Sequence, residues 1–207
     1  MNERRLVLAF DCDDVLIQTA SKVMNHFESS YNIVVDPAHF YSGTAKQWGV
    51  GDLRTVNRRI ERYFKDYSHE LLVPDPEALI AIPALARVHE LHLVTGRAEF
   101  MEPITQQMAD EHFPGCFASI THTNFFKPRF RRTKGQVCKE LGVDVLTDDH
   151  LKHCESVLDA GIENAILFGD HAWNRSEMPL RAGIVRGVDW TRTQMEIAKI
   201  AGREFSV

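Results

Sequence analysis

The sequence of 207 residues predicts an α/β fold of three layers, in which a mostly parallel sheet lies between helices and a small helical segment follows the first strand. Aliphatic runs of strand length alternate with helical patterns from about residue 83 onward, which is typical of parallel strands joined by right-handed crossovers. Residues 17–82 show helical periodicity without a strand pattern. We therefore expect a core of residues 1–16 and 83–207 and an inserted helical segment of residues 17–82.

The first expected strand is the aliphatic run from Leu6 to Phe10, which stops at Asp11 and Asp13. A buried strand that ends in acids delivers them to the carboxyl edge of the sheet, where open α/β sheets keep their sites. Two clustered carboxylates repel each other unless a cation lies between them, and Mg²⁺ is the simplest such cation. The alternative is an Asp-rich turn, because Asp also favours turns and helix N-caps.

Two amphipathic helices are expected in the inserted segment. Their apolar stripes are Ile17, Ala20, Met24, Phe27 and Tyr31 in the first, and Leu53, Val56, Ile60, Tyr63 and Tyr67 in the second. Proline and glycine residues mark residues 35–51, between these helices, as a loop. Trp48 lies in this loop and joins neither stripe.

Five more strands and four more helices are expected after the inserted segment. The strands are residues 92–95, 117–121, 144–147, 165–168 and 183–185, and the helices are residues 99–112, 134–141, 151–160 and about 191–201. Because the carboxyl ends of parallel strands meet at one edge, polar residues that directly follow these strands are candidates for a shared site.

Polar groups at three later positions would reach that edge. Thr95 and Gly96 close the second expected strand, and a hydroxyl and a backbone N–H ahead of a helix suit an anionic oxygen. Lys134 begins a helix, where the macrodipole disfavours a cation, so it makes more sense if it points at an anion. A solvated basic loop is the alternative for this lysine. Asp148 and Asp149 follow another aliphatic strand.

Two separate strands that both end in paired acids are difficult to explain by turn chemistry alone. If the two strand ends are close in space, Asp11, Asp13 and Asp149 would surround one Mg²⁺ ion, with Asp148 beside them. The sequence therefore predicts a magnesium site at the carboxyl edge of the sheet.

Composition narrows the class of protein. A hydrophobic fraction of 44% with 26% charged residues fits a globular domain, and a net charge of −5 argues against binding to a nucleic acid polymer. Four cysteines without a CxxC spacing favour a reduced, cytoplasmic setting. We expect no membrane partner, since no apolar run approaches the roughly 20 residues of a spanning helix. The oligomeric state is not indicated.

The motifs in combination resemble the haloacid dehalogenase-like (HAD) hydrolase superfamily. They are, in chain order, Asp11-x-Asp13-x-Val15, the helical insertion, Thr95, Lys134 and Asp148-Asp149. Residues 166–175, with Trp173 and Asn174, are similar to the 5′(3′)-deoxyribonucleotidase-like branch, which often carries a Trp-Asn pair after its last core strand. Asp14 departs from that branch, which commonly has Gly there, and a charged side chain facing the cap would alter which leaving groups fit.

The resemblance implies a Rossmann-like core with a helical cap and the activity of a Mg²⁺-dependent phosphomonoesterase. The implied substrate is a small phosphate ester such as a nucleoside monophosphate. Asp11 would attack phosphorus to give an aspartyl-phosphate. Asp13 would be the general acid and base, and its carbonyl would bind the metal beside Asp11 and Asp149. Because dehalogenases of the superfamily lack this second acid, Asp13 favours phosphoryl transfer.

The remaining groups would hold the phosphoryl oxygens or orient their neighbours. Thr95, Gly96 and Lys134 would bind the phosphoryl group, and Asp148 would orient Lys134 or a metal-bound water. Trp48 is open to a contact with substrate. A phosphotransferase or mutase on the same scaffold, and a non-catalytic module that binds phosphate or nucleotide, are the alternative functions.

Four histidines near strand ends are also candidate metal ligands. They are His122, His150, His153 and His171. Because no HxxxH or HxH spacing supports a metal site, surface or helix-capping roles are expected for them.

Overall fold

A six-stranded parallel sheet forms the centre of the protein. The computed structural model describes residues 4–41, 43–123, 132–175 and 179–202, so most of the basic loop that precedes Lys134 lies outside the described residues. Every neighbouring strand pair is parallel, in the order β3-β2-β1-β4-β5-β6. The strands are β1 (Val7–Phe10), β2 (Glu90–Thr95), β3 (Phe117–His122), β4 (Val145–Asp148), β5 (Asn164–Phe168) and β6 (Ile184–Gly187).

The strand order places a topological switch point between β1 and β4. The chain runs outward from β1 to β3, then returns to the other side of β1 and runs outward again from β4 to β6. The connections after β1 and after β4 therefore run in opposite directions along the sheet, and the carboxyl ends of β1 and β4 border the crevice where open α/β sheets bind ligands.

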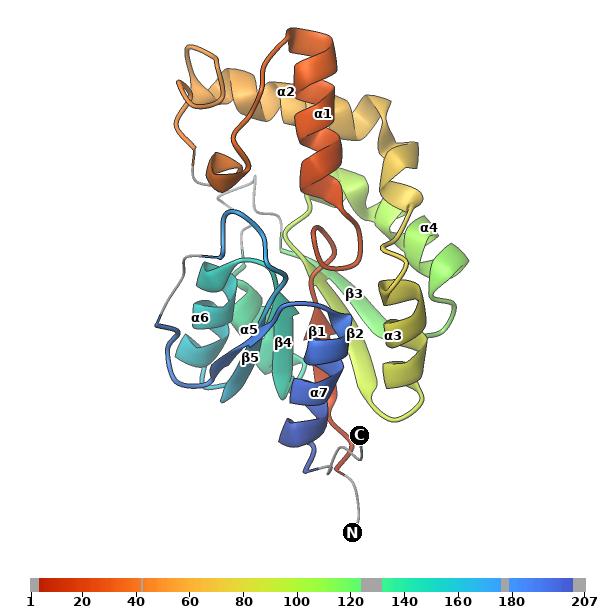
Figure 1. Ribbon diagram of the computed structural model, residues 1–207. Helices are drawn as coiled ribbons and strands as arrows, with labels where there is room; N and C mark the ends of the chain where they lie inside the picture. The colour runs from red at the N-terminus through yellow and green to blue at the C-terminus, as the bar shows by residue number, and fades with distance from the viewer. Residues whose placement is uncertain (1–3, 42, 124–131, 176–178, 203–207) are drawn as a thin grey trace.

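Helices cover both faces of this sheet (Figure 1). The helices of the described residues are α1 (Thr19–Tyr31), α2 (Leu53–Asp66), α3 (Ala78–Ala86), α4 (Glu102–His112), α5 (Lys134–Glu140), α6 (Leu151–Asp159) and α7 (Trp190–Ile200), of which α1 and α2 lie above the sheet and not on its faces. Helices α3 and α7 contact each other on one face, and α5 and α6 contact each other on the opposite face. The three-layer α/β fold predicted from the sequence is confirmed. None of the helices in the described residues is long and apolar enough to span a membrane.

Alternating side chains of β1 supply both layers of the core. Leu8 and Phe10 join the cluster beneath α3 and α7, whereas Ala9 joins the cluster beneath α5. Both faces of a parallel strand are buried in such a fold, which explains the continuous aliphatic runs of the sequence.

Helices α1 and α2 pack on a second hydrophobic cluster, which Met101 of the core also joins, above the carboxyl ends of the strands (Figure 1). We call residues 19–72, which contain both, the helical segment. Trp48 belongs to this cluster, where it is 3% exposed and its ring centroid lies 4.9 Å from that of Phe27. The contact with substrate that the sequence left open for Trp48 therefore has no support, because its indole is a core group.

The packing changes from one cluster to the other before α3. Leu71 belongs to the cluster of the helical segment, while Ala78 and Ile82 of α3 belong to the cluster of the sheet. The expected boundary between residues 82 and 83 cuts through this helix. The other expected strands and helices agree with the structure, with ends that shift by at most three residues.

Candidate active site

Asp11 and Asp148 lie side by side because their strands are in register. Phe10 pairs with Thr147 in the ladder between β1 and β4, and the Asp11 N–H donates to the Thr147 carbonyl oxygen at 3.0 Å. Adjacent strands lie about 4.8 Å apart, so the residues that follow this pair leave the sheet as neighbours. The switch point thus receives one acid from each strand.

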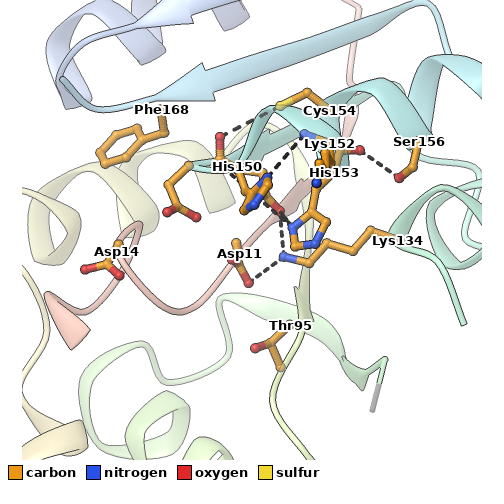
Figure 2. Close-up of polar contacts among 12 residues, drawn as sticks. Asp11, Asp14, Thr95, Lys134, His150, Lys152, His153, Cys154, Ser156 and Phe168 are labelled. Atoms are coloured by element: carbon orange, nitrogen blue, oxygen red, sulfur yellow. Dashed lines mark hydrogen bonds and ion pairs between the residues drawn. The ribbon is translucent and has the colours of Figure 1, made fainter. Parts of the chain in front are cut away.

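Lys134 reaches these two acids because α5 approaches α6 closely. A Cβ atom on Gly135 would lie 2.0 Å from the Ser156 carbonyl oxygen, so only glycine allows this approach. Lys134 Nζ lies 2.7 Å from Asp11 Oδ1 and 2.6 Å from Asp148 Oδ2. Figure 2 shows the ammonium group directed at Asp11, with Thr95 facing them from β2.

Burial and neighbouring charges set the pKa values of Asp11, Asp148 and Lys134. Burial raises the pKa of Asp11 to about 6, although the charge of Lys134 opposes the rise. Burial alone would also raise the pKa of Asp148, but the charges of His153 and Lys134 outweigh it, and the pKa falls below its ordinary value. For Lys134, Asp11 and Asp148 outweigh burial and raise its pKa. The ammonium group is therefore a permanent cation beside the Asp11 carboxylate.

His153 completes the acidic centre, which we define as Asp11, Lys134, Asp148 and His153. Its Nδ1 lies 3.0 Å from Asp148 Oδ1, and Asp148 also accepts from the His150 N–H at 2.9 Å. Side-chain ligand atoms of Asp11, Asp148 and His153 lie within 4.8 Å of one another. Because Lys134 already lies between the two acids, an ammonium group occupies the space that a metal ion would need there.

Asp13 is held by a buried arginine. Arg97 donates to it twice, from Nε to Oδ2 at 2.9 Å and from Nη2 to Oδ1 at 2.7 Å, and Thr19 donates its hydroxyl at 2.5 Å. Burial alone would raise the pKa of Asp13, but Arg97 outweighs it and the pKa is lowered. Since Arg97 also donates to Thr105, its guanidinium is fixed. Asp13 is an ionised carboxylate in this conformation.

Thr95 and Gly96 lie at the same edge, on the other side of β1. Phe10 pairs with Leu93, so Thr95 ends β2 just beyond the level of Asp11. Its hydroxyl oxygen accepts from the Arg97 N–H at 3.2 Å, which leaves the hydroxyl proton available to an incoming anion. Gly96 directly follows the strand and is partly exposed.

Asp149 is held by the loop after β5. Trp173 Nε1 donates to Asp149 Oδ2 at 2.9 Å, and Asn174 Nδ2 donates to the Asp149 carbonyl at 2.9 Å. Burial raises the pKa of Asp149 well above its ordinary value, and the charges of Asp148, Asp14 and Asp11 add to the rise. The carboxylate is thus placed among other acids with little positive charge nearby.

A divalent cation fits this excess of acids. Asp11 and Asp149 are buried, mutually repelling carboxylates, and oxygen donors of this kind suit Mg²⁺. The side chain of Asp13 is engaged by Arg97, so only its carbonyl would remain for a metal. The groups that would hold Mg²⁺ are therefore the carboxylates of Asp11 and Asp149 and the carbonyl of Asp13.

Asp14 and Tyr41 form the rim of the site. The backbone of Asp14 is left-handed, with φ of 57°, and its carboxylate accepts from the Ala20 N–H and from the Tyr41 hydroxyl. Burial raises the pKa of Asp14 to about 7. Tyr41 comes from the helical segment, so this hydrogen bond joins that segment to the loop that follows β1.

Comparison with solved structures identifies the fold. A haloacid dehalogenase-like family hydrolase from Streptococcus pneumoniae matches with a TM-score of 0.63 at 10% identity, covering 93% of this chain and 98% of its own. A protein from Clostridium difficile described as a phosphatase matches with a TM-score of 0.62 at 13% identity, covering 94% and 99%. A Bacillus subtilis protein assigned as a HAD hydrolase, in a magnesium-bound form, matches with a TM-score of 0.59 at 12% identity, covering 96% and 100%.

This is the HAD hydrolase fold. Identities this low establish the fold alone, and no family model and no curated protein matches the chain. The HAD fold gathers the residues that the sequence singled out, namely Asp11, Asp13, Thr95, Gly96, Lys134, Asp148 and Asp149, at the carboxyl edge of one sheet.

The sequence interpretation did not assign Arg97 or His153 to the site. Arg97 follows the Thr95-Gly96 motif and lies 84 positions from Asp13, so only the fold reveals their pairing. His150 does cap α6, as expected, by accepting from the Lys152 N–H, but His153 contacts Asp148 inside the site. A histidine in the first turn of the helix that follows the paired acids was the signal that could have found it.

Proposed function

We propose that this protein is a Mg²⁺-dependent phosphomonoesterase that acts through an aspartyl-phosphate on Asp11. The observation that carries the proposal is a buried carboxylate at the switch point with a permanent cation 2.7 Å away. Binding of phosphate alone would not require a carboxylate there, since it repels the ligand. The solved structures of this fold that are described as hydrolase and phosphatase support a hydrolytic reaction.

In the first step, Asp11 attacks phosphorus and the bond from phosphorus to the ester oxygen breaks. Lys134 and the hydroxyl of Thr95 neutralise the phosphoryl oxygens, so that the carboxylate can approach them. In the second step, water attacks the same phosphorus, the bond to Asp11 breaks and phosphate leaves. Magnesium, when bound by Asp11, Asp149 and the Asp13 carbonyl, supplies further positive charge to the phosphoryl group.

Asp13 would give a proton to the leaving alkoxide and then take one from the attacking water. A carboxylate held by Arg97 and Thr19 is ionised, so it must exchange these partners for the leaving group before it can be an acid. Loss of the Thr19 hydrogen bond and of one Arg97 contact would raise its pKa. Asp13 therefore changes its hydrogen-bond partners when the substrate binds.

The rim favours a substrate with a planar group, such as a nucleoside monophosphate. The ring of Tyr41 lies 5.2 Å from that of Trp173 and 5.5 Å from that of His150, measured between centroids. Aromatic rings at the mouth of a phosphate site offer a surface on which a base can stack. A small phosphate ester with a planar leaving group is the substrate class that fits this rim.

The experiment is the Asp11→Asn variant, assayed for hydrolysis of a generic aryl phosphate with Mg²⁺. We expect activity to fall by at least about 10³-fold, because an amide does not form the covalent intermediate. The matched control is Asp159→Asn, an exposed carboxylate on α6 that pairs with Arg181 and should change nothing. Circular dichroism would show that both variants fold. Substantial turnover by Asp11→Asn would refute the proposal.

A further inference from the structure

The turn that contains Asp14 does not require a side chain at that position. Its φ of 57° is a backbone conformation that glycine adopts most easily and that Asp tolerates. The turn after β1 therefore needs no carboxylate at this position. The role of this carboxylate therefore follows from the groups that it contacts.

Asp14 binds the helical segment at two separate points. Oδ1 accepts from the Ala20 N–H at 3.0 Å, in the first turn of α1, where the flanking Gln18 makes no side-chain cap. Oδ2 accepts from the Tyr41 hydroxyl at 2.9 Å, in the loop between α1 and α2. One carboxylate of the core thus holds both the start of α1 and a distant loop of the same segment.

Tyr41 is held on its other sides by rings of the core. Its ring meets Trp173 edge to face, with an interplanar angle of 80° and centroids 5.2 Å apart. The neighbouring Phe40 lies 5.9 Å from Trp173 and 5.5 Å from Trp48, so it connects the rim to the cluster of the helical segment. The segment therefore meets the core here through two adjacent aromatic rings.

The same contacts reach a residue of the proposed metal site. Trp173 donates to Asp149 Oδ2 and stacks on His171 at 4.5 Å, with 4° between the ring planes. His171 Nε2 lies 3.2 Å from the Asp14 carbonyl oxygen. Asp14, Tyr41, Trp173 and His171 consequently form a closed circuit of contacts.

We propose that Asp14 is a positioning residue, which fastens Tyr41 over the acidic centre and through Tyr41 keeps Trp173 against Asp149. The hydrogen bond from Tyr41 to Asp14 is the latch between the helical segment and the core. When it is made, Trp173 is covered by Tyr41 and Phe40. When it is broken, the loop that carries Tyr41 can leave, and the indole of Trp173 is exposed to solvent.

Fluorescence quenching by acrylamide in the full-length protein tests this latch. The protein has three tryptophans, and Trp48 and Trp190 are each 3% exposed, so the quencher reports mainly on Trp173. A single hydrogen bond to a charged group changes an equilibrium by about tenfold or more. We expect Tyr41→Phe and Asp14→Gly each to raise the quenching constant about two- to threefold.

The double variant separates a latch from two independent effects. If the hydrogen bond is the common cause, Asp14→Gly combined with Tyr41→Phe should quench no more than either single variant. Asp14→Asn should give an intermediate quenching constant, because its single uncharged amide oxygen can accept from the Tyr41 hydroxyl but then presents its NH2 group to the Ala20 N–H. Tyr67→Phe is the matched control, since Tyr67 is 37% exposed in the helical segment and stacks on Tyr63.

Additive quenching in the double variant, or no change in Tyr41→Phe, would overturn the latch. Asp14→Gly alone could expose Trp173 by loosening α1, and Tyr41→Phe excludes that cause because it leaves the contact to Ala20 intact. The measurement needs no turnover, so its failure would leave the proposed phosphatase activity standing.

Discussion

The acidic centre and the rim of the site are built in different ways. Every residue of the acidic centre comes from the sheet or from helices packed on it, and Lys134 is tied to two acids with its side chain 2% exposed. The rim joins the helical segment to the loop after β1 through the hydroxyl of Tyr41, a residue that is 41% exposed.

This difference separates reactivity from selection of the substrate. Charges fixed by a rigid sheet need no reorganisation when a phosphoryl group arrives, which is the condition for electrostatic catalysis. In the proposed phosphatase, a rim held by a few contacts would open to admit the substrate and close to exclude water. Changes in the centre should therefore have large effects and changes in the rim smaller ones.

The largest expected effect is that of Lys134→Met in the centre. The variant leaves Asp11 and Asp148 buried without their shared cation, which should cost about 3–5 kcal/mol in the free energy of unfolding. Hydrolysis of an aryl phosphate should fall by at least about 10²-fold. Urea denaturation and initial rates measure the two effects.

Lys139→Met is the control for this prediction, because Lys139 lies on the same helix and is exposed. We expect it to unfold and to react like the unaltered protein. Equal stability of the two variants would contradict the view that the centre is a buried ion cluster.

A smaller effect on stability is expected from His150, which contacts Tyr41 at the rim. Burial lowers the pKa of His150 to about 4, and the nearby charge of His153 contributes. The unfolded chain binds a proton near pH 6.5 and the folded protein does not, so stability is complete above about pH 6.5 and declines as the pH falls toward 4. Protonation would also destroy the N-cap of α6, in which Nδ1 accepts from the Lys152 N–H.

His150→Asn removes this titration and keeps a capping side chain. Between pH 7 and pH 4.5, its free energy of unfolding should decline by about 1–2 kcal/mol less than that of the unaltered protein. His69→Asn, at an exposed histidine of the helical segment, should reproduce the unaltered pH dependence. If His150→Asn also shows the pH dependence of the unaltered protein, His150 is not a buried neutral group in the folded state.

Local patterns predicted the fold well, for a clear physical reason. Aliphatic runs such as β1 are strands buried on both faces, and amphipathic stripes such as that of α2 show directly which side chains are buried. The expected boundary at residue 82 falls inside α3, which is apolar nearly all round, so its sequence does not reveal which cluster it joins. The same limit applied to Trp48, whose partners come from distant parts of the helical segment.

The sequence predicts only those site residues whose positions are set by the ends of the strands. Register brings Asp11 beside Asp148, and any parallel sheet with this order would do the same. The pairing of Asp13 with Arg97 and that of Tyr41 with Asp14 depend on how loops fold over the edge, and no spacing encodes them. The sequence therefore indicated the acids and Lys134, but not Arg97 and Tyr41, which bind Asp13 and Asp14.

Covalent trapping on Asp11 tests the central claim most directly. The Asp13→Asn variant should still transfer phosphate from an aryl phosphate, whose leaving group needs no proton, but should lack the base for the attacking water. Acid quenching and mass spectrometry are predicted to find phosphate on Asp11, in step with a burst of one aryl alcohol for each protein molecule. The absence of a burst, or phosphate on another residue, would contradict the account.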